Sequence, residues 1–472
     1  MSRLAVRQDF PLIVFLCGAA GFTWMVQNDP FFWDTIQLAS KHAHFFYENG
    51  RAWKVLPPEI DSGHPPVFGY YLAVLWTFFG KTLPVSHWAM VPFLLAIIVS
   101  LYRLGRTLGG RSWAYWLLPL VLLDPVFLGQ SALVSPDVAL AAFFLCSLDG
   151  LLNRKTWLVI FGTTGLCIIS MRGMMCAGGL FIWLFVSDRK WFFRNAWLSF
   201  TPGFMLAGAF LHWHFRETGW IGYHAGSPWA PAFRPAGPLE MIRNIAIIGW
   251  RWLDFGRLGE WMAAGILLWL GWKNEVGKNK FPVEKRLLWL FVVLVGLLSI
   301  SAVRYNNLSA HRYFLPLFMI LHFLVFQWIV KSSLLRVASK NLVLTVVCII
   351  LAAGSFQVYP HGISMDWDST PAHLPYHEVR TSAIAFLKQE HIALSEVGSA
   401  FPNVNTEEAV SLDGNFDAFT AIDTINNRYV MISNVFNDVS KEDREYFMRS
   451  WRLIWQQQRG RVWAEIYQKE EK

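Results

Sequence analysis

Two aspartates stand where a carboxylate could accept a proton during a reaction. Asp34 follows the first apolar segment, in NDPFFWDTIQLASKHAHFFYENG, and Asp137 opens a later apolar segment, in SPDVALAAFF. A carboxylate that takes the proton of an attacking hydroxyl group acts as a general base. We therefore interpret Asp34 and Asp137 as candidate catalytic residues. The structural alternatives are a solvated or capping carboxylate at Asp34 and, at Asp137, a contact with the dipole of the helix that begins at Pro136.

Cationic and aromatic side chains mark three further places. Arg172, in SMRGMMCAGG, lies between two apolar runs without an acidic neighbour in sequence. His311, Arg312 and Tyr313 directly precede LPLF, and His64 precedes a double proline in EIDSGHPPVFGYY. Cationic donors form strong hydrogen bonds to phosphate, so we interpret these five as candidate substrate-binding residues for an anionic ligand. The alternatives are a snorkelling arginine at a helix end for Arg172 and structural roles for the others.

The composition assigns these side chains to a membrane protein. Of 472 residues, 54% are hydrophobic and 16% are charged, with 25 Trp and 38 Phe. Soluble proteins usually carry about 25% charged residues, so the composition excludes the soluble and disordered classes. Up to Val358 the chain has 30 basic and 16 acidic residues. After Val358 it has 11 basic and 17 acidic residues, so the net charge of the whole chain is +8. We assign the basic excess to cytoplasmic loops rather than to nucleic-acid binding.

Eleven apolar runs predict membrane-spanning helices, since about 20 residues cross the hydrocarbon core and snorkelling ends shorten the requirement. A further apolar segment, from Pro66 to Gly80, is short and rich in aromatic residues. If this segment does not span, most Lys- and Arg-rich loops fall on the side of Arg3 and Arg7, as the positive-inside rule requires. We therefore expect it to lie in the outer interface. The predicted spans cover roughly residues 10–27, 88–104, 113–131, 137–152, 157–171, 173–187, 196–215, 258–272, 286–303, 312–330 and 341–358.

This topology places the loop of residues 28–87, the loop of residues 216–257 and the whole tail on the outer side. The tail has helical patterns over 378–389 and 441–457 and strand patterns over 428–435 and 461–467. The expected fold class is an all-α polytopic membrane protein with about 11 or more spans and interfacial helices in residues 28–87. The expected domains are this transmembrane part, residues 1–358, and a small extracytoplasmic α/β domain, residues 359–472.

The order and side of these features resemble the GT-C glycosyltransferases that use polyprenyl-phosphate sugars, in the branch of the protein O-mannosyltransferases and aminoarabinose transferases. The resemblance covers roughly residues 10–330. The matching features are Asp34 before an interfacial helix, the turn Gly63-His64-Pro65-Pro66, the basic Gly-containing turn from Arg103 to Arg111, Asp137 at the head of the fourth span, the pair Arg172-Gly173, and Arg312-Tyr313 before Leu315-Pro316.

The resemblance implies an inverting transfer of a sugar from a polyprenyl-phosphate donor to an acceptor on the outer face. Asp34 would activate or orient the acceptor nucleophile, and Arg172 and Arg312 would hold the lipid phosphate. This sequence departs from the family where His64 replaces a Lys, so that a phosphate contact there is charged only near or below pH ~6.5. It also has Thr where relatives carry Glu after the first-loop Asp, and Asp29 is a rival acid one turn earlier.

We expect no cofactor and no metal, because Asp34 and Asp137 alone are too few ligands for a divalent ion. The sequence leaves two other classes of function open, a transporter or lipid flippase and a membrane scaffold whose tail binds partners. The sugar is open, and so is the acceptor, whether glycan, lipid or protein. The expected location is a bacterial inner membrane, with the site and the tail facing the periplasm, membrane lipids as partners and no nucleic acid.

Overall fold

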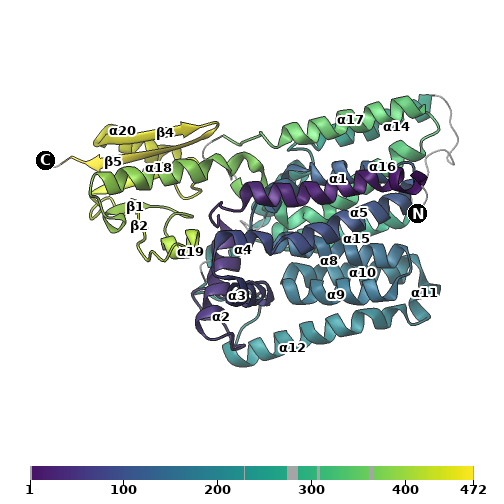
Figure 1. The fold of residues 1–472 in the computed structure, drawn as a ribbon, viewed down its shortest axis with the longest axis horizontal. Helices are drawn as coiled ribbons and strands as arrows, with labels where there is room; N and C mark the ends of the chain where they lie inside the picture. The colour runs from purple at the N-terminus through teal and green to yellow at the C-terminus, as the bar shows by residue number, and fades with distance from the viewer. Residues whose placement is uncertain (1–2, 228, 274–284, 306–308, 361–365, 471–472) are drawn as a thin grey trace.

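A bundle of apolar helices forms the larger part of the protein (Figure 1). The fold is known from a computed structural model that describes residues 3–227, 229–273, 285–305, 309–360 and 366–470. Each of the eleven ranges predicted as spans contains helix. These helices are α1 Arg3–Val26, α5 Val91–Gly109, α6 Leu117–Leu122 with α7 Pro125–Ser131, α8 Pro136–Leu152, α9 Thr156–Ile169, α10 Met171–Ser187, α12 Thr201–Thr218, α14 Leu258–Lys273, α15 Lys285–Arg304, α16 Leu315–Lys331 and α17 Val337–Gly354.

Fewer of these helices are long and apolar enough to cross a membrane than the sequence predicted. Within the described residues four satisfy both conditions, Leu83–Gly109, Lys285–Arg304, His311–Lys331 and Val337–Gly354, and a bent pair could make a fifth. Helices such as α9 and α10 are shorter than the roughly 20 residues that cross the hydrocarbon core. The positions of the eleven helical segments are therefore confirmed. By length and hydropathy, however, fewer than eleven of them qualify as full spans.

The predicted span over residues 113–131 is broken. Ala114–Leu122 and Pro125–Ser131 meet at an angle of 73°. The break lies at Asp124, whose side chain accepts hydrogen bonds from the backbone N–H groups of Val126 and Phe127 and so caps α7, with Pro125 at its first position. The expectation of one continuous helix was wrong, because Asp124 and Pro125 start a new helix within the apolar run.

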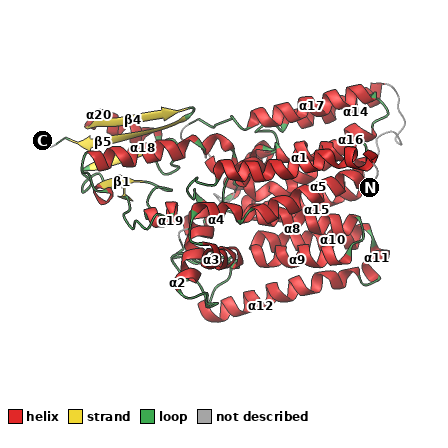
Figure 2. Ribbon diagram, viewed as in Figure 1, coloured by secondary structure: helices red, strands yellow, loops and turns green. Residues whose placement is uncertain are grey.

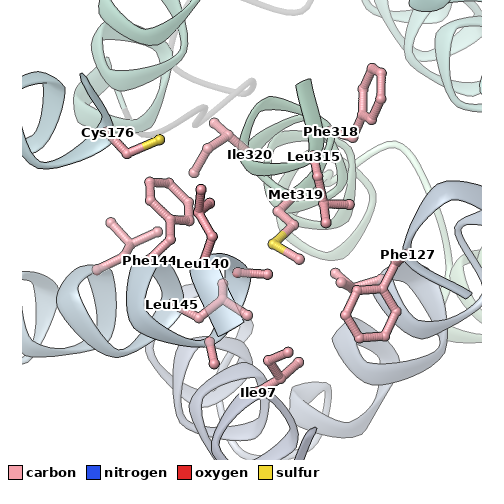
Figure 3. Close-up of a cluster of buried hydrophobic side chains, with 14 of the residues drawn as sticks. Ile97, Phe127, Leu140, Phe144, Leu145, Cys176, Leu315, Phe318, Met319 and Ile320 are labelled. Atoms are coloured by element: carbon pink, nitrogen blue, oxygen red, sulfur yellow. The ribbon is translucent and has the colours of Figure 1, made fainter. Parts of the chain in front are cut away.

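Helix α16 lies at the centre of the bundle. The candidate span His311–Lys331 is 89% buried inside the protein, against 28% for the spans of α15 and α17. Figure 3 shows Leu315, Phe318 and Met319 of α16 packed among side chains from other helices, including Phe127 and Leu140. A helix that is apolar all round needs such surroundings. The residues that precede α16, including Arg312, are therefore at the middle of one end of the bundle.

Short helices between α1 and α5 cover that same end. They are the π-helix Ile36–Lys41, α2 His42–Glu48, α3 Val67–Phe79 and α4 Leu83–Trp88. Figure 1 shows α2 and α3 at the end of the bundle that faces the C-terminal domain, running across the direction of the bundle helices. The prediction of a short non-spanning helix over residues 66–80 agrees with α3. Helix α13, Pro238–Arg251, belongs to the second outer loop, and α11, Arg189–Phe193, connects α10 to the next bundle helix.

The C-terminal part is a small α/β unit with a mixed five-stranded sheet of order β2-β1-β3-β5-β4 (Figure 2). Strands β1 and β3 are parallel, whereas β3, β5 and β4 are antiparallel neighbours. The helix predicted over residues 441–457 ends at Ser450 and continues as a strand, because Trp451 to Arg459 pair with the last strand. The elements are α18 Pro375–Gln389, β1 Val397–Ser399, α19 Glu407–Ser411, β2 Thr420–Ala421, β3 Tyr429–Ser433, α20 Lys441–Ser450, β4 Trp451–Arg459 and β5 Val462–Lys469.

Candidate functional site

Arg312 is surrounded by three carboxylates at the end of the bundle that faces the C-terminal domain. It lies in the short 3₁₀ helix His311–Phe314 that leads into α16. Its Nη2 atom donates a hydrogen bond to Asp34, its Nε atom lies 3.6 Å from Oδ2 of Asp137, and its Nη1 atom is paired with Asp368. The predicted residues Asp34, Asp137 and Arg312 therefore meet, although they are far apart in the sequence.

Arg172 joins the same group from α10. Its Nη2 atom lies 2.7 Å from Oδ1 of Asp137, and its Nη1 atom donates to the backbone oxygen of Arg312 over 3.4 Å. Ser170 caps α10 and Ser135 caps α8, and these caps fix the helix starts that carry Arg172 and Asp137. A snorkelling arginine would direct its guanidinium to solvent, whereas this one is held by the neighbouring carboxylate.

Tyr313 contacts both arginines through its aromatic ring. The guanidinium carbon of Arg172 is 4.4 Å from the centre of its ring, and that of Arg312 is 5.1 Å away. Both distances are typical of cation–π interactions. The hydroxyl group also lies 3.4 Å from Nη2 of Arg312. Tyr313 thus holds the two cations near each other, and its role in binding stays a prediction.

His64 reaches the group as a neutral side chain. Its Nδ1 atom accepts a hydrogen bond from the backbone N–H of Met171, next to Arg172, over 3.3 Å. Burial, together with the nearby Arg172 cation, lowers the pKa of His64 from 6.5 to about 3. The sequence allowed a charged phosphate contact near or below pH ~6.5. In the folded protein His64 is a neutral hydrogen-bonding group at that pH.

His311 points away from the other predicted residues. Its Nε2 atom lies 2.6 Å from Asp254 and its Nδ1 atom 2.9 Å from Asp366, and Nη2 of Arg251 lies 2.8 Å from the same oxygen of Asp366. The ring is fully buried and also stacks near Phe255. His311 is therefore held in a neighbouring ionic network rather than beside Asp34, although the adjacent Arg312 is in the site.

Asp34 begins the irregular helix of the first outer loop. Trp33, directly before it, has a φ of +53°, a conformation that is unfavourable for a large side chain. Residues 36–41 form a π-helix, which is rare and occurs frequently at functional sites. The rival acid Asp29 is placed differently: its backbone oxygen accepts a hydrogen bond from His87, and no contact joins it to Arg312 in the part of the chain described. The geometry thus favours Asp34 over Asp29 as the candidate general base.

Asp368 is the site residue that the sequence analysis missed. It belongs to the 3₁₀ helix Trp367–Ser369, in the segment that leads into the C-terminal domain. The sequence DWDST is short and polar, and nothing in its spacing indicates that it returns to the membrane part. Only the packing of this segment on α7 brings its carboxylate to Arg312.

A second group of charges inside the bundle was also missed. Arg257 is fully buried and pairs with Asp124 at 2.8 Å and Asp254 at 3.4 Å. His322 continues the chain of contacts, with Glu260 at 2.7 Å and Asp124 at 3.3 Å. The available signal was the presence of these charges within apolar segments, since such groups are costly unless paired. The sequence predicted that charges gather at the outer mouths, and this group extends further into the bundle.

Two cavities adjoin the site. The first has a volume of about 20 Å³, room for about one water molecule, and its lining includes His64, Asp137 and Arg172. The second has a volume of about 300 Å³ and is lined by Trp53, Pro65, Val67, Cys167, Ile168, Leu206, Ala209, Phe210 and Trp213. Pro65 borders both. A small pocket that includes charged side chains therefore lies beside a larger apolar one. Within the described residues no three His, Cys, Asp or Glu side chains are grouped as metal ligands.

The site brings together a proton acceptor and cations. Asp34, partly exposed and held by Arg312, can accept a proton from a hydroxyl group. Arg172 and Arg312 present guanidinium groups that can stabilise negative charge on a phosphate. This combination suits a reaction in which a hydroxyl group attacks and a phosphate departs.

Comparison with known proteins identifies a shared fold. No family model and no curated protein matches the sequence. Two solved structures match over nearly the whole chain. The structure of ArnT from Cupriavidus metallidurans bound to undecaprenyl phosphate has a TM-score of 0.55 and 11% identity, covering 97% of this chain and 98% of ArnT. The apo structure of the same protein has a TM-score of 0.53 and 12% identity, covering 96% and 97%. The chain therefore shares the fold of ArnT.

Proposed function

We propose that the protein is an integral-membrane glycosyltransferase that moves a sugar from a polyprenyl-phosphate carrier to an acceptor, with inversion at the sugar. The observation that carries this proposal is the meeting of Asp34, Asp137, Arg172 and Arg312 at one end of the bundle. Four charged residues from distant segments are costly to gather beside an apolar environment, so their convergence indicates a function.

In the proposed reaction Asp34 accepts the proton of the acceptor hydroxyl as its oxygen attacks the sugar carbon. The bond from that carbon to the phosphate oxygen breaks, and the electron pair leaves with the polyprenyl phosphate. Arg172 and Arg312 neutralise the charge that grows on the departing phosphate. Asp137, which contacts both arginines, positions them. His64, neutral in its buried position, is available as a hydrogen-bond donor through Nε2.

Two observations support a lipid-linked donor. The ArnT structure that shares this fold was solved with undecaprenyl phosphate bound. In this chain the apolar cavity of about 300 Å³ and the small cavity beside His64, Asp137 and Arg172 are both bordered by Pro65. A phosphate linked to an isoprenoid chain has matching polar and apolar parts. The proposed location is a bacterial inner membrane, with the site and the C-terminal domain on the periplasmic side.

The test is transfer of a radiolabelled sugar from polyprenyl-phosphate donors to membrane acceptors by the purified protein. We expect Asp34→Asn to remain folded and to lose transfer by at least about 100-fold, because the amide cannot accept the proton. Asp29→Asn is the matched control, since Asp29 lies five residues earlier in the same loop, and it should retain activity. Full activity of Asp34→Asn contradicts the assignment of Asp34 as the base. The absence of any transfer by the wild-type protein contradicts the proposal that it is a glycosyltransferase.

A further inference from the structure

The C-terminal segment inserts a carboxylate into the site. Asp368 is 3% exposed, and its Oδ2 atom is paired with Nη1 of Arg312. Its other oxygen, Oδ1, is buried and accepts no hydrogen bond from the described residues. A buried carboxylate oxygen without a donor is unfavourable, so the side chain is held there chiefly by one cation.

The charges of the site do not favour an incoming anion in this arrangement. Two guanidinium groups, Arg172 and Arg312, face three carboxylates, Asp34, Asp137 and Asp368. The small cavity beside them has room for little more than a water molecule. A lipid phosphate therefore needs one carboxylate to withdraw before it can reach Arg312.

The contacts indicate which carboxylate withdraws. Asp137 bonds to Arg172 as well as to Arg312, and it is fixed in the first turn of α8. Asp34 is the proposed base and must stay. Among the described residues the Asp368 carboxylate pairs with Arg312 alone, and one of its oxygens is unsatisfied, so it is released at the lowest cost.

We propose that Asp368 occupies the place of the lipid phosphate on Arg312 and is displaced when the donor binds. Asp368 is then a positioning residue that couples the C-terminal domain to donor binding. This inference rests on the proposed function, because it assumes a phosphate ligand at Arg312.

The segment that carries Asp368 is anchored without its carboxylate. The side chain of Gln130 in α7 donates to the backbone oxygen of Asp368 over 2.7 Å, and the indole of Trp367 donates to the backbone oxygen of Asn434 over 2.8 Å. Gly129 lies so close to Thr370 that an added Cβ would be 2.7 Å from its backbone nitrogen. Asp368→Asn therefore removes the charge while these contacts remain.

The experiment measures binding of undecaprenyl phosphate to the full-length protein in nanodiscs, with the KM for the sugar donor as second readout. We expect Asp368→Asn to tighten binding by about tenfold and to lower KM in parallel, since a competing charge is lost. Glu378→Gln removes the same charge from an exposed site on α18, where Glu378 pairs with Arg459, and should leave binding unchanged.

Unchanged or weaker binding in Asp368→Asn overturns the inference, because loss of a carboxylate that competes with the phosphate for Arg312 must strengthen binding. Asp368→Ser serves as a second variant if the asparagine keeps a hydrogen bond to Arg312, and it should shift binding in the same direction. The two proposals fail separately. If the wild-type protein binds the lipid and transfers sugar but Asp368→Asn shows no gain, only this inference fails. If the wild-type protein does neither, the proposed function fails.

Discussion

Arg312 shows why the identity of a single residue matters here. Its planar guanidinium contacts Asp34, Asp137 and Asp368 through three different nitrogen atoms. A lysine has one nitrogen at the end of a flexible chain and cannot reproduce this fork. The arginine therefore fixes the relative positions of the three carboxylates as well as supplying charge.

At His64 the structure predicts a specific pH dependence. Burial lowers its pKa from 6.5 to about 3, so the ring stays neutral between pH ~5.5 and ~8. We expect the affinity for undecaprenyl phosphate to follow the same pH profile in the wild-type protein and in His64→Asn, whose amide oxygen can still accept from Met171. Binding that strengthens below pH 6.5 only in the wild-type protein would show a protonated His64 on the phosphate.

The same pKa has a consequence for stability. Because the folded protein holds the neutral ring, the unfolded chain takes up a proton first as the pH falls below 6.5. The contribution of His64 to the free energy of unfolding is thus complete above pH 6.5 and is lost between pH 6.5 and about 3.

Among the elements, the turn before α3 depends on one glycine. Gly63 has a φ of +71°, and an added Cβ would lie 2.2 Å from the backbone oxygen of Gly222 in the second outer loop. Asp61 fixes this turn: one oxygen accepts from the N–H of Gly63 over 2.8 Å, and the other lies 2.9 Å from His214 of α12. The turn positions the adjacent His64.

We expect Gly63→Ala to lower the free energy of unfolding by roughly 2–5 kcal/mol and to weaken binding of undecaprenyl phosphate. Gly50→Ala is the matched control, because Gly50 has a similar φ of +62° but open space around its Cβ position. It should cost only about 1–2 kcal/mol for the backbone strain. Equal losses in thermal unfolding of the two variants would show that the close approach to Gly222 is unimportant.

The break between α6 and α7 is stabilised by charge. Asp124 caps α7 and is paired with the fully buried Arg257 at 2.8 Å, which also contacts Asp254. Such a buried pair stabilises the fold little more than apolar side chains of similar volume would. Removing one partner, however, leaves the other as an unpaired buried charge.

Arg257→Met should therefore destabilise the protein by roughly 3–5 kcal/mol in thermal or denaturant unfolding. The control is Arg154→Met, which breaks a pair with Asp188 at 3.0 Å in which the arginine side chain is 64% exposed. Its loss should stay below about 1 kcal/mol. If both variants were equally stable, the network around Asp124 would not hold the bend.

At the scale of the whole molecule, the C-terminal domain packs on the short helices between α1 and α5. Glu408 of α19 accepts from Lys81 and lies 3.1 Å from Nε2 of His44, and Ser40 donates to the backbone oxygen of Ala409 over 2.6 Å. Figure 1 shows the C-terminus at this end of the molecule and the N-terminus at the other end of the bundle. The first outer loop and the tail thus belong to one side.

This arrangement, together with the Lys- and Arg-rich loops at the opposite end, predicts the orientation in the membrane. In a variant with Cys17 replaced by Ser, we expect Ile425→Cys, in an exposed loop of the C-terminal domain, to react with a membrane-impermeant maleimide on intact spheroplasts. Val337→Cys, exposed at the start of α17 on the opposite end, should react only after permeabilisation. The reverse labelling would place the site in the cytoplasm.

The sequence by itself determined the helices and the class of protein. Apolar runs report burial in lipid or core directly, so the eleven helical segments and the short helix before Gly80 follow from composition and period. In the tail, α18, β3, α20 and β5 follow in the same way, whereas β1, α19, β2 and β4 do not. Charged residues at the ends of apolar runs stand out for the same reason. Asp34, Asp137, Arg172 and Arg312 are therefore recognisable as candidates from the amino-acid sequence alone.

Only the tertiary structure decided which of these residues meet. His311 and Arg312 are adjacent in sequence, yet their side chains enter different networks because the 3₁₀ helix turns them apart. Asp368 joins the site through packing of the C-terminal segment on α7, and the bend at Asp124 depends on a buried partner far along the chain. Contacts between distant segments depend on shape and charge pairing in three dimensions, which spacing along one chain does not encode.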